Sequence, residues 1–266
     1  MSPRLSEHWL DGRLVPAGEA PAAGDPRQAR DPGCYTTARV RAGTARHAAA
    51  HARRLARDAL ALGIGEIPAD TLPELFSTLG RHAFGAGEGV IRVEARAGAG
   101  GAAQLRGVPR DLGPGQATWT ACIAPFPHGG PSPWPGAKLL GEELYERARA
   151  LAQREEVDEV LLLDDAGSLV EGARSNLLVI DAEGQLWTPD LTLGAVAGIA
   201  LAAIRGGFPE LRTRKLRGER LGELREIIAV NAVRGARAIV SLDGHRVGTG
   251  EPGSWARQLD DFLSRA

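Results

Sequence analysis

Alternating apolar and polar residues predict strands in the N-terminal half of the chain. The alternation on either side of Asp11-Gly12 predicts a β-hairpin, because this dipeptide adopts the left-handed backbone of a tight turn. Residues 33–43 predict a strand that ends in a turn, and residues 89–97 and 117–126 predict two strands around a glycine-rich connection. These segments indicate the sheet of an α+β domain.

Two helices are expected between these strands. Apolar residues recur at helical spacing over residues 44–65, where Thr44 is the expected N-cap and Gly63 the stop signal. A second helix is expected over residues 69–84. Both would bury one face against the sheet.

A run rich in proline and glycine, residues 127–136, predicts a linker and a domain boundary. An amphipathic helix is expected directly after it, over residues 137–156. We therefore expect a smaller α+β domain over residues 1–126 and a larger α/β, barrel-like domain over residues 137–266. Helices of the larger domain are also expected at 195–207 and 253–266, and strands at 157–164, 168–172, 174–181, 185–189, 211–217, 226–232 and 236–244.

The composition is that of an ordinary globular protein. Of 266 residues, 43% are hydrophobic and 24% charged, and the net charge of −1 argues against nucleic acid as a partner. No apolar run approaches the length of a membrane-spanning helix, and the N-terminus carries no secretory signal pattern. Cys34 and Cys122 form no disulfide framework, so a cytoplasmic location is expected.

Two familiar motifs are set aside. His47 and His51 lie four residues apart on one helical face, as metal ligands can, but no further His or Cys cluster lies near them in sequence. The stretch "GAGGAA", residues 98–103, fits a dinucleotide-binding loop, yet proline and glycine follow where a helix should begin. We expect no metal.

One lysine and one glutamate remain as candidates for chemistry. Of the 32 Lys and Arg residues only Lys138 and Lys215 are lysine, and Lys138 is expected to begin a helix at the domain boundary. Glu171 lies between two apolar strands, where a carboxylate is costly unless it is paired. Lysine can form an imine, which arginine cannot usefully do. A surface lysine and a turn glutamate are the alternative interpretation.

A phosphate-bearing cofactor would also need anion ligands. Arg54 on the first helix is one candidate, and the helix start within "GAVAGIA" offers free backbone N–H groups. Asn231, at the end of a predicted strand, could add a side-chain donor. A solvated arginine, a closely packed helix start and a turn asparagine remain the alternatives.

Together these residues resemble the class IV aminotransferase family, the fold type IV pyridoxal-phosphate enzymes. The resemblance rests on five segments in order: "GCYTTARV" with "HARRL", "AKLLGEEL", "DEVLLLDDAGSLVEGARSNLLVI", "LWTPDLTLGAVAGIA" and "VNAVRGARAIVSLDG". It implies an α+β fold of two domains, similar to D-amino acid aminotransferase, with pyridoxal 5′-phosphate between the domains. It also implies a homodimer that acts on a small amine substrate.

The resemblance implies a role for each matched residue. Lys138 would bond the cofactor and move the substrate proton, and Glu171 would hold the ring nitrogen protonated. The other cofactor-binding residues that it implies are Arg54, Ser175, Asn176, Val196, Ile199, Ala200, Asn231 and Ala232.

Within the family, "GCYTTARV" and "NAVRGARAIV" are most similar to aminodeoxychorismate lyase, which forms 4-aminobenzoate and pyruvate for the folate pathway. The alternatives are an aminotransferase for branched-chain or D-amino acids and a non-catalytic protein with this fold. Candidate substrate residues are Thr36, Thr37, Arg106 and Arg174. The sequence departs from the family pattern at Ala102 and Leu201, where an arginine is usual.

Overall fold

The computed structural model describes residues 5–18, 33–98 and 101–265 and divides the chain into two compact units. Unit 1 comprises Met1–Pro114 and Ala137–Gly141, and unit 2 comprises Gly115–Gly136 and Glu142–Ala266. Residues 99 and 100 of the glycine-rich motif lie outside the described residues. Within the described part of the chain, no helix is both long enough and apolar enough to cross a membrane.

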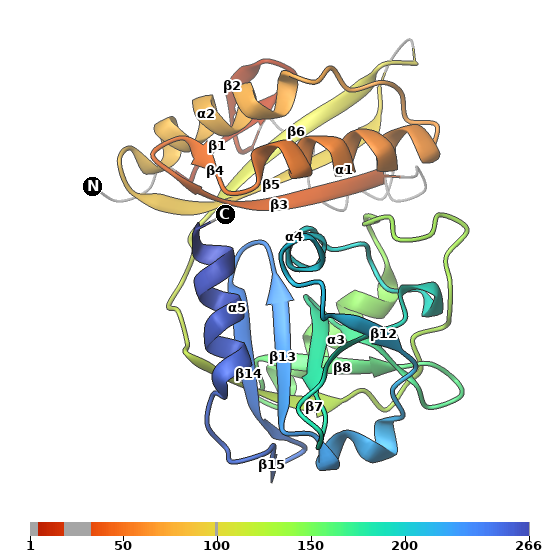
Figure 1. The fold of residues 1–266 in the computed structure, drawn as a ribbon. Helices are drawn as coiled ribbons and strands as arrows, with labels where there is room; N and C mark the ends of the chain where they lie inside the picture. The colour runs from red at the N-terminus through yellow and green to blue at the C-terminus, as the bar shows by residue number, and fades with distance from the viewer. Residues whose placement is uncertain (1–4, 19–32, 99–100, 266) are drawn as a thin grey trace. The chain divides into compact units, whose positions relative to one another are not determined.

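Unit 1 is built on one antiparallel sheet (Figure 1). Its strands are β1 (Glu7–Leu10), β2 (Arg13–Pro16), β3 (Gly33–Arg41), β4 (Thr44–Ala45), β5 (Glu88–Ala97) and β6 (Ala103–Arg110). They lie in the order β2-β1-β6-β5-β3-β4. The predicted hairpin is confirmed, because β1 pairs with β2 and Asp11 and Gly12 both have positive φ, as the turn requires.

Two helices pack on the same face of this sheet, α1 (Ala48–Ala61) and α2 (Thr71–Phe84). The predicted N-cap of the first helix is wrong. Thr44 pairs with Arg41 in β4, so the chain reverses once more before His47, with a φ of 55°, begins α1. The core between helices and sheet consists mainly of Cys34, Ala38, Val40, Leu55, Leu72, Leu75, Phe76, Leu79, Ile91, Val93 and Leu105.

The sequence did not predict β6, because its proline and glycine argue against a strand. β6 pairs with β5 along its whole length, but β1 reaches it only at Arg106 and Gly107. Pro109 therefore lies where β6 is an edge strand, so the missing N–H costs no ladder hydrogen bond. Gly107 is required by close packing, since a Cβ there would meet Leu75 and Leu79 of α2.

Unit 2 contains a nine-stranded mixed sheet. Its strands are β7 (Thr118–Ile123), β8 (Glu159–Leu163), β9 (Leu169–Gly172), β10 (Asn176–Ile180), β11 (Leu186–Pro189), β12 (Arg212–Arg214), β13 (Glu226–Asn231), β14 (Gly235–Leu242) and β15 (His245–Arg246). The order is β12-β11-β10-β13-β14-β7-β8-β9, and β15 pairs with β14. β7 pairs in parallel with β14 and β8, so it belongs to this sheet, whereas the expected boundary at residue 126 assigned it to the N-terminal domain.

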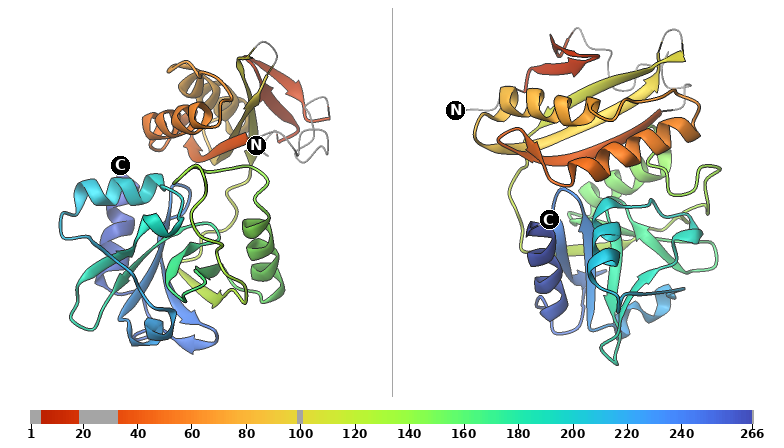
Figure 2. Two further views of the ribbon diagram at one scale, coloured as in Figure 1. Left: turned by 90° about the vertical axis from the view of Figure 1, so that its right-hand side faces the viewer. Right: turned by 45° about the horizontal axis from the view of Figure 1, so that its top comes forward.

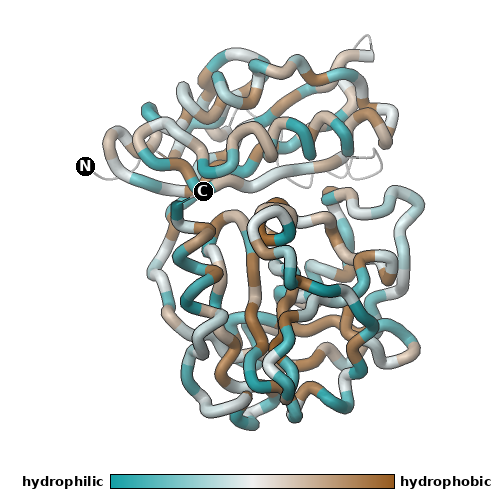
Figure 3. The backbone as a smooth tube through the Cα atoms, viewed as in Figure 1, coloured by the Kyte–Doolittle hydropathy of each residue, from teal (hydrophilic) through white to brown (hydrophobic). Residues whose placement is uncertain are grey.

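Apolar side chains cover both faces of the central strands of unit 2. On β10 and β13, Leu178 and Ile228 pack with α4 (Ile199–Gly207) and α5 (Ser254–Arg265), whereas the alternate residues Leu177 and Ile227 enter a second core. A sheet buried on both faces explains why these strands are continuous apolar runs, and Figure 3 shows β13 brown along much of its length. The third helix, α3 (Glu143–Arg154), packs on β8 (Figure 2). Short 3-10 helices lie at Leu191–Leu193 and Gly218–Glu223.

Candidate active site

Lys138 lies on an extended segment of unit 1, not at the start of a helix as the sequence predicted. The helix begins only at Glu143, because residues 138–140 are used to cover the edge of β3. The Lys138 carbonyl accepts a hydrogen bond from the Tyr35 N–H at 2.9 Å, and the Leu140 N–H donates to the Gly33 carbonyl at 2.8 Å. β4 pairs with β3 only at its far end, so this edge would otherwise be open.

The backbone of Lys138 is held from its other side by Asp58. Its N–H donates to Oδ2 of Asp58 at 3.1 Å, and the Arg57 guanidinium donates to Oδ1 at 2.9 and 2.6 Å. Asp58 is 1% exposed, and no sequence pattern identified it. Both backbone groups of Lys138 are therefore hydrogen-bonded, which fixes the base of its side chain.

The Lys138 amine lies over the ring of Tyr35, with Nζ 4.9 Å from the ring centroid, and the guanidinium of Arg92 lies 3.9 Å from the same centroid. Tyr35 points away from the helices, as alternation along β3 requires. The same alternation separates the two predicted substrate threonines. Thr36 points toward α1 and is fully buried, whereas Thr37 shares the face of Tyr35 and pairs with Arg92.

Arginines gather on this face of the unit 1 sheet. Arg92 forms an ion pair with Glu94 at 2.8 Å, and Glu94 lies opposite Arg106 on β6. Arg106 Nη2 is 3.1 Å from Nδ1 of His8, and its buried Nε has no hydrogen-bond partner among the described residues. Burial lowers the pKa of Arg106, and the neighbouring Arg92 and Arg96 lower it further, whereas Glu94 opposes the shift. Arg92 and Arg106 thus share one carboxylate, Glu94, and this excess of positive charge favours an added anion.

Arg54 is 9% exposed and reaches back from α1 to the sheet. Its Nη2 donates to Thr36 Oγ1 at 2.6 Å, and Nδ1 of His51 lies 2.6 Å from the same oxygen. Burial lowers the pKa of Arg54 to about 10, and its Nε has no partner among the described residues. Burial and the charge of Arg54 hold the pKa of His51 well below its usual range, so this imidazole is neutral.

Glu171 on β9 is 3% exposed and accepts hydrogen bonds from three segments of unit 2. The hydroxyl of Tyr145 donates to Oε1 at 2.5 Å. Oε2 accepts from the Val196 N–H at 3.1 Å and from Nδ2 of Asn176 at 3.4 Å. His128 Nε2 lies 3.6 Å from Oε1. These donors compensate the buried carboxylate; neither Tyr145 nor His128 was identified from the sequence.

Ser175 does not present its hydroxyl to Glu171. The Oγ–H donates to Oε2 of Glu159 at 2.5 Å, and Oε1 of the same carboxyl accepts from the Val160 N–H at 3.0 Å. Glu159 is fully buried, and burial raises its pKa from 4.5 to about 7. Ser175 therefore anchors the turn that follows Glu171, and Arg174 on that turn is exposed.

The first turn of α4 presents the backbone N–H groups of Ile199 and Ala200, which a helix leaves without intrahelical acceptors. Val196 precedes this turn and accepts a hydrogen bond from Nδ2 of Asn176 on its carbonyl at 2.9 Å. Gly198 is required here, because a Cβ at this position would overlap Oδ1 of Asn176. The helix start is thus tied to the Glu171 network through Asn176.

Asn231 ends β13, and its side-chain oxygen is used in the β13–β14 turn. Oδ1 accepts from the N–H groups of Val233 and Arg234 at 3.1 and 2.8 Å. Its Nδ2 group remains as the side-chain donor expected from the sequence, and Ala232 follows it in the turn.

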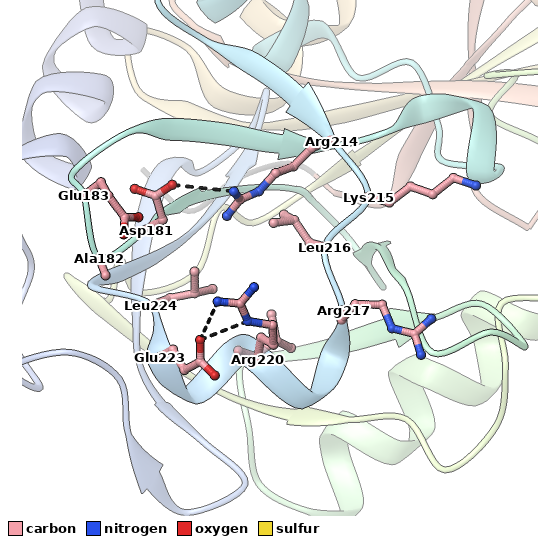
Figure 4. A pocket seen from close by; sticks show the side chains of 11 residues that line it. Asp181, Ala182, Glu183, Arg214, Lys215, Leu216, Arg217, Arg220, Glu223 and Leu224 are labelled. Carbon is pink, nitrogen blue, oxygen red and sulfur yellow. Dashed lines mark hydrogen bonds and ion pairs between the residues drawn. The ribbon is translucent and has the colours of Figure 1, made fainter.

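A separate cavity of about 180 Å³ in unit 2 is lined by none of these residues (Figure 4). It contains Lys215, but its arginines are paired with acids: Arg214 lies 3.6 Å from Asp181, and Arg220 lies 2.8 Å from Glu223. These ion pairs leave little net charge to attract an anion. No group of three His, Cys, Asp or Glu side chains in the described residues is arranged for a metal ion.

Comparison with known proteins identifies the family. A sequence model of the family described as "Amino-transferase class IV" matches residues 33–242, which is most of the chain. The chain belongs to the class IV aminotransferase family. It is therefore a pyridoxal-phosphate-dependent enzyme. No curated protein sequence matches the chain.

Solved structures of class IV aminotransferases share the fold. A branched-chain aminotransferase from Thermoproteus uzoniensis with norvaline is 22% identical, with a TM-score of 0.83 over 97% of this chain and 93% of that one. The branched-chain amino acid aminotransferase of Escherichia coli is 22% identical, with a TM-score of 0.84 over the same shares. A third such enzyme, from T.th. and complexed with N-(5′-phosphopyridoxyl)-L-glutamate, is 18% identical, with a TM-score of 0.83 over 99% and 94%.

The described residues suit the chemistry of this cofactor. The buried Nε of Arg54 has no partner among them, as a phosphate-binding guanidinium would without its anion. Glu171 accepts three hydrogen bonds, and a carboxylate offers about four acceptor positions, so one position remains for a further donor.

Proposed function

We propose that this protein is an aminotransferase that moves the amino group of a small amino acid onto a keto acid. The observation that supports it is the placement of the Lys138 amine over Tyr35, beside Arg92 and on the same sheet face as Arg106. A reactive amine next to guanidinium groups suits a substrate that carries both an amine and a carboxylate.

Lys138 and Glu171 carry the chemistry in this proposal. Pyridoxal phosphate supplies an aldehyde that bonds amines and a protonated ring that accepts electrons. Lys138 would hold that aldehyde through its amine, and the same amine would move the proton of the substrate α-carbon. Glu171 would accept a hydrogen bond from the protonated ring nitrogen. Val196 and Asn176 hold Glu171 in place through its Oε2.

The phosphate ligands are Arg54 and backbone or side-chain N–H groups in this proposal. Arg54 supplies the charge, since its buried Nε has no other partner among the described residues. The N–H groups of Ile199 and Ala200 supply the positive end of the α4 dipole. Asn231 and Ala232 add donors from the β13–β14 turn.

Substrate carboxylates are assigned to Arg92 and Arg106. Arg106 lies on β6, next to Arg92 on β5, and would act from that strand. Such a charged face favours a dicarboxylate such as glutamate as amine donor over a purely aliphatic amino acid. The complex of the T.th. enzyme with a phosphopyridoxyl-glutamate adduct supports this preference, because that protein has the same fold.

Aminodeoxychorismate lyase is the second candidate. More than one arginine on the Tyr35 face suits a substrate with two carboxylates, and Thr37 offers a hydroxyl on the same face. The segments "GCYTTARV" and "NAVRGARAIV" also favour it. The two reactions share their first proton transfer and differ in what leaves afterwards.

One pair of assays separates these functions. Purified protein loaded with pyridoxal phosphate is given glutamate or leucine with a keto acid, and separately aminodeoxychorismate. Amine transfer without release of 4-aminobenzoate supports the aminotransferase, and release of pyruvate and 4-aminobenzoate supports the lyase. Lys138→Ala is expected to abolish either activity, whereas Lys215→Ala, the only other lysine exchange available, leaves it intact. Full activity of Lys138→Ala would refute the assignment.

We further propose that the protein is a cytoplasmic homodimer, as the family resemblance implies. Sedimentation of the loaded protein at micromolar concentration tests the dimer, and a single species of 28.0 kDa would contradict it.

A further inference from the structure

Glu171 is contacted by two residues that no motif of the family resemblance includes, Tyr145 and His128. Tyr145 lies in the first turn of α3. His128 lies in the segment between β7 and α3, where its backbone N–H donates to the Leu163 carbonyl at 2.7 Å. The Tyr145 hydroxyl is 2.5 Å from Oε1 of Glu171 and 3.4 Å from Nε2 of His128. The side chains of His128 and Glu171 are each 4% exposed.

The direction of these hydrogen bonds follows from the number of protons. An ionised carboxylate only accepts, so the single hydroxyl proton of Tyr145 points to Glu171. The Tyr145 oxygen then accepts from His128, which requires the proton of the imidazole to be on Nε2. Nδ1 of His128 is buried and has no hydrogen-bond partner among the described residues. The imidazole of His128 therefore donates to the Tyr145 oxygen, and the Tyr145 hydroxyl donates to Oε1 of Glu171. In such a series the first hydrogen bond strengthens the second.

We propose that His128 and Tyr145 are positioning residues that stabilise the charged form of Glu171 and thereby keep the proton of the cofactor on its ring nitrogen. The proton shared between the ring nitrogen and Glu171 lies on the nitrogen only while the carboxylate is the weaker base. A hydroxyl donating at 2.5 Å to Oε1 weakens it as a base. This inference rests on the proposed role of Glu171 toward pyridoxal phosphate.

The test measures where that proton lies. Wild-type protein and variants are loaded with pyridoxal phosphate labelled with ¹⁵N in the ring, and the ¹⁵N chemical shift separates the protonated from the neutral ring. Tyr145→Phe removes the hydroxyl and keeps the ring. We expect the proton equilibrium to move toward the neutral ring by about tenfold or more, the effect of one charge-assisted hydrogen bond. In the assays above, kcat should fall while KM changes little.

His128→Phe tests whether His128 acts on Glu171 through Tyr145 or independently of it. If His128 acts through Tyr145, its replacement shifts the ¹⁵N resonance in the wild type but adds little in the Tyr145→Phe background. Equal effects in both backgrounds would overturn the series. The matched control is Thr188→Val, which removes a buried hydroxyl that donates to the Leu177 carbonyl at 2.9 Å and should leave the resonance unchanged.

The outcomes separate this inference from the function on which it rests. A wild-type protein that binds no labelled cofactor overturns both. Cofactor binding with a protonated ring in the wild type and an unchanged resonance in Tyr145→Phe overturns the inference alone. A shift in Tyr145→Phe that Thr188→Val does not reproduce supports it.

Discussion

Glu159 should make the stability of unit 2 depend on pH. Its carboxyl is fully buried next to the turn that follows Glu171, and its hydrogen bonds come from the Ser175 hydroxyl and the Val160 N–H. Burial raises its pKa from 4.5 to about 7, against the opposing effect of those two hydrogen bonds. The perturbation is Glu159→Gln, which keeps the shape and cannot ionise; its oxygen can still accept from the Val160 N–H, and its NH2 group can donate to the Ser175 hydroxyl.

The sign follows from proton binding. Between pH 4.5 and about 7 the folded state holds a proton on Glu159 that the unfolded chain has released. The free energy of unfolding therefore falls as pH rises through this range. The contribution is fully present below pH 4.5 and lost above about pH 7. Since one pKa unit corresponds to 1.36 kcal/mol, the loss is about 3 kcal/mol.

The assay is urea unfolding at pH 5 and pH 8, followed by tryptophan fluorescence. Four of the five tryptophans lie in unit 2, so the signal reports mainly on that unit. From pH 5 to pH 8, wild type should lose about 2.5 kcal/mol more of its unfolding free energy than Glu159→Gln does, because part of the full loss already occurs below pH 5. Glu155→Gln serves as the control, because it removes a carboxylate that is 47% exposed on α3's C-terminal side.

A parallel pH dependence in wild type and Glu159→Gln would refute this reasoning. It would mean that the hydrogen bonds from Ser175 and Val160 compensate burial completely and that Glu159 is ionised at neutral pH. The expected result would instead show that the turn after Glu171 is held most firmly when Glu159 is protonated.

Two further predictions concern the cofactor phosphate and the packing at the start of α4. Arg54→Met should weaken pyridoxal phosphate binding by about 10- to 100-fold, the effect of one charge-assisted hydrogen bond, without weakening binding of pyridoxal, which has no phosphate. Fluorescence titration measures both affinities, and replacement of the exposed Arg53 by Met is the control. An equal loss of affinity for pyridoxal would contradict the assignment of Arg54 to the phosphate. Gly198→Ala should destabilise the protein by about 1–3 kcal/mol in thermal unfolding, because the new methyl group overlaps Asn176. Gly206→Ala in the same helix meets nothing within 4 Å and should stabilise by up to about 1 kcal/mol, and equal effects of the two exchanges would contradict the packing argument.

Several features of the fold and of the site could be predicted from the sequence. The apolar runs of β10 and β13 predict strands because both faces of that sheet are buried. Period-two alternation also implies that Thr36 and Thr37 face opposite sides of β3, so only one of these two candidate substrate residues can face a substrate on a given side. Tyr145 was missed because, in sequence, it is one polar residue on an amphipathic helix, 26 residues from Glu171.

The sequence by itself determined the family, the main strands and helices, and the residue types that this chemistry needs. Those properties depend on local periodicity and on motifs whose members are close in the chain. Only the tertiary structure decided that Lys138 lies on an extended segment, because the open edge of β3, about 100 residues earlier, supplies the hydrogen bonds that a helix would otherwise make. The tertiary structure likewise decided that the Ser175 hydroxyl donates to Glu159 and that the Tyr145 hydroxyl donates to Glu171. Pairings of this kind depend on how distant segments cross and in which register they meet, which no local pattern encodes.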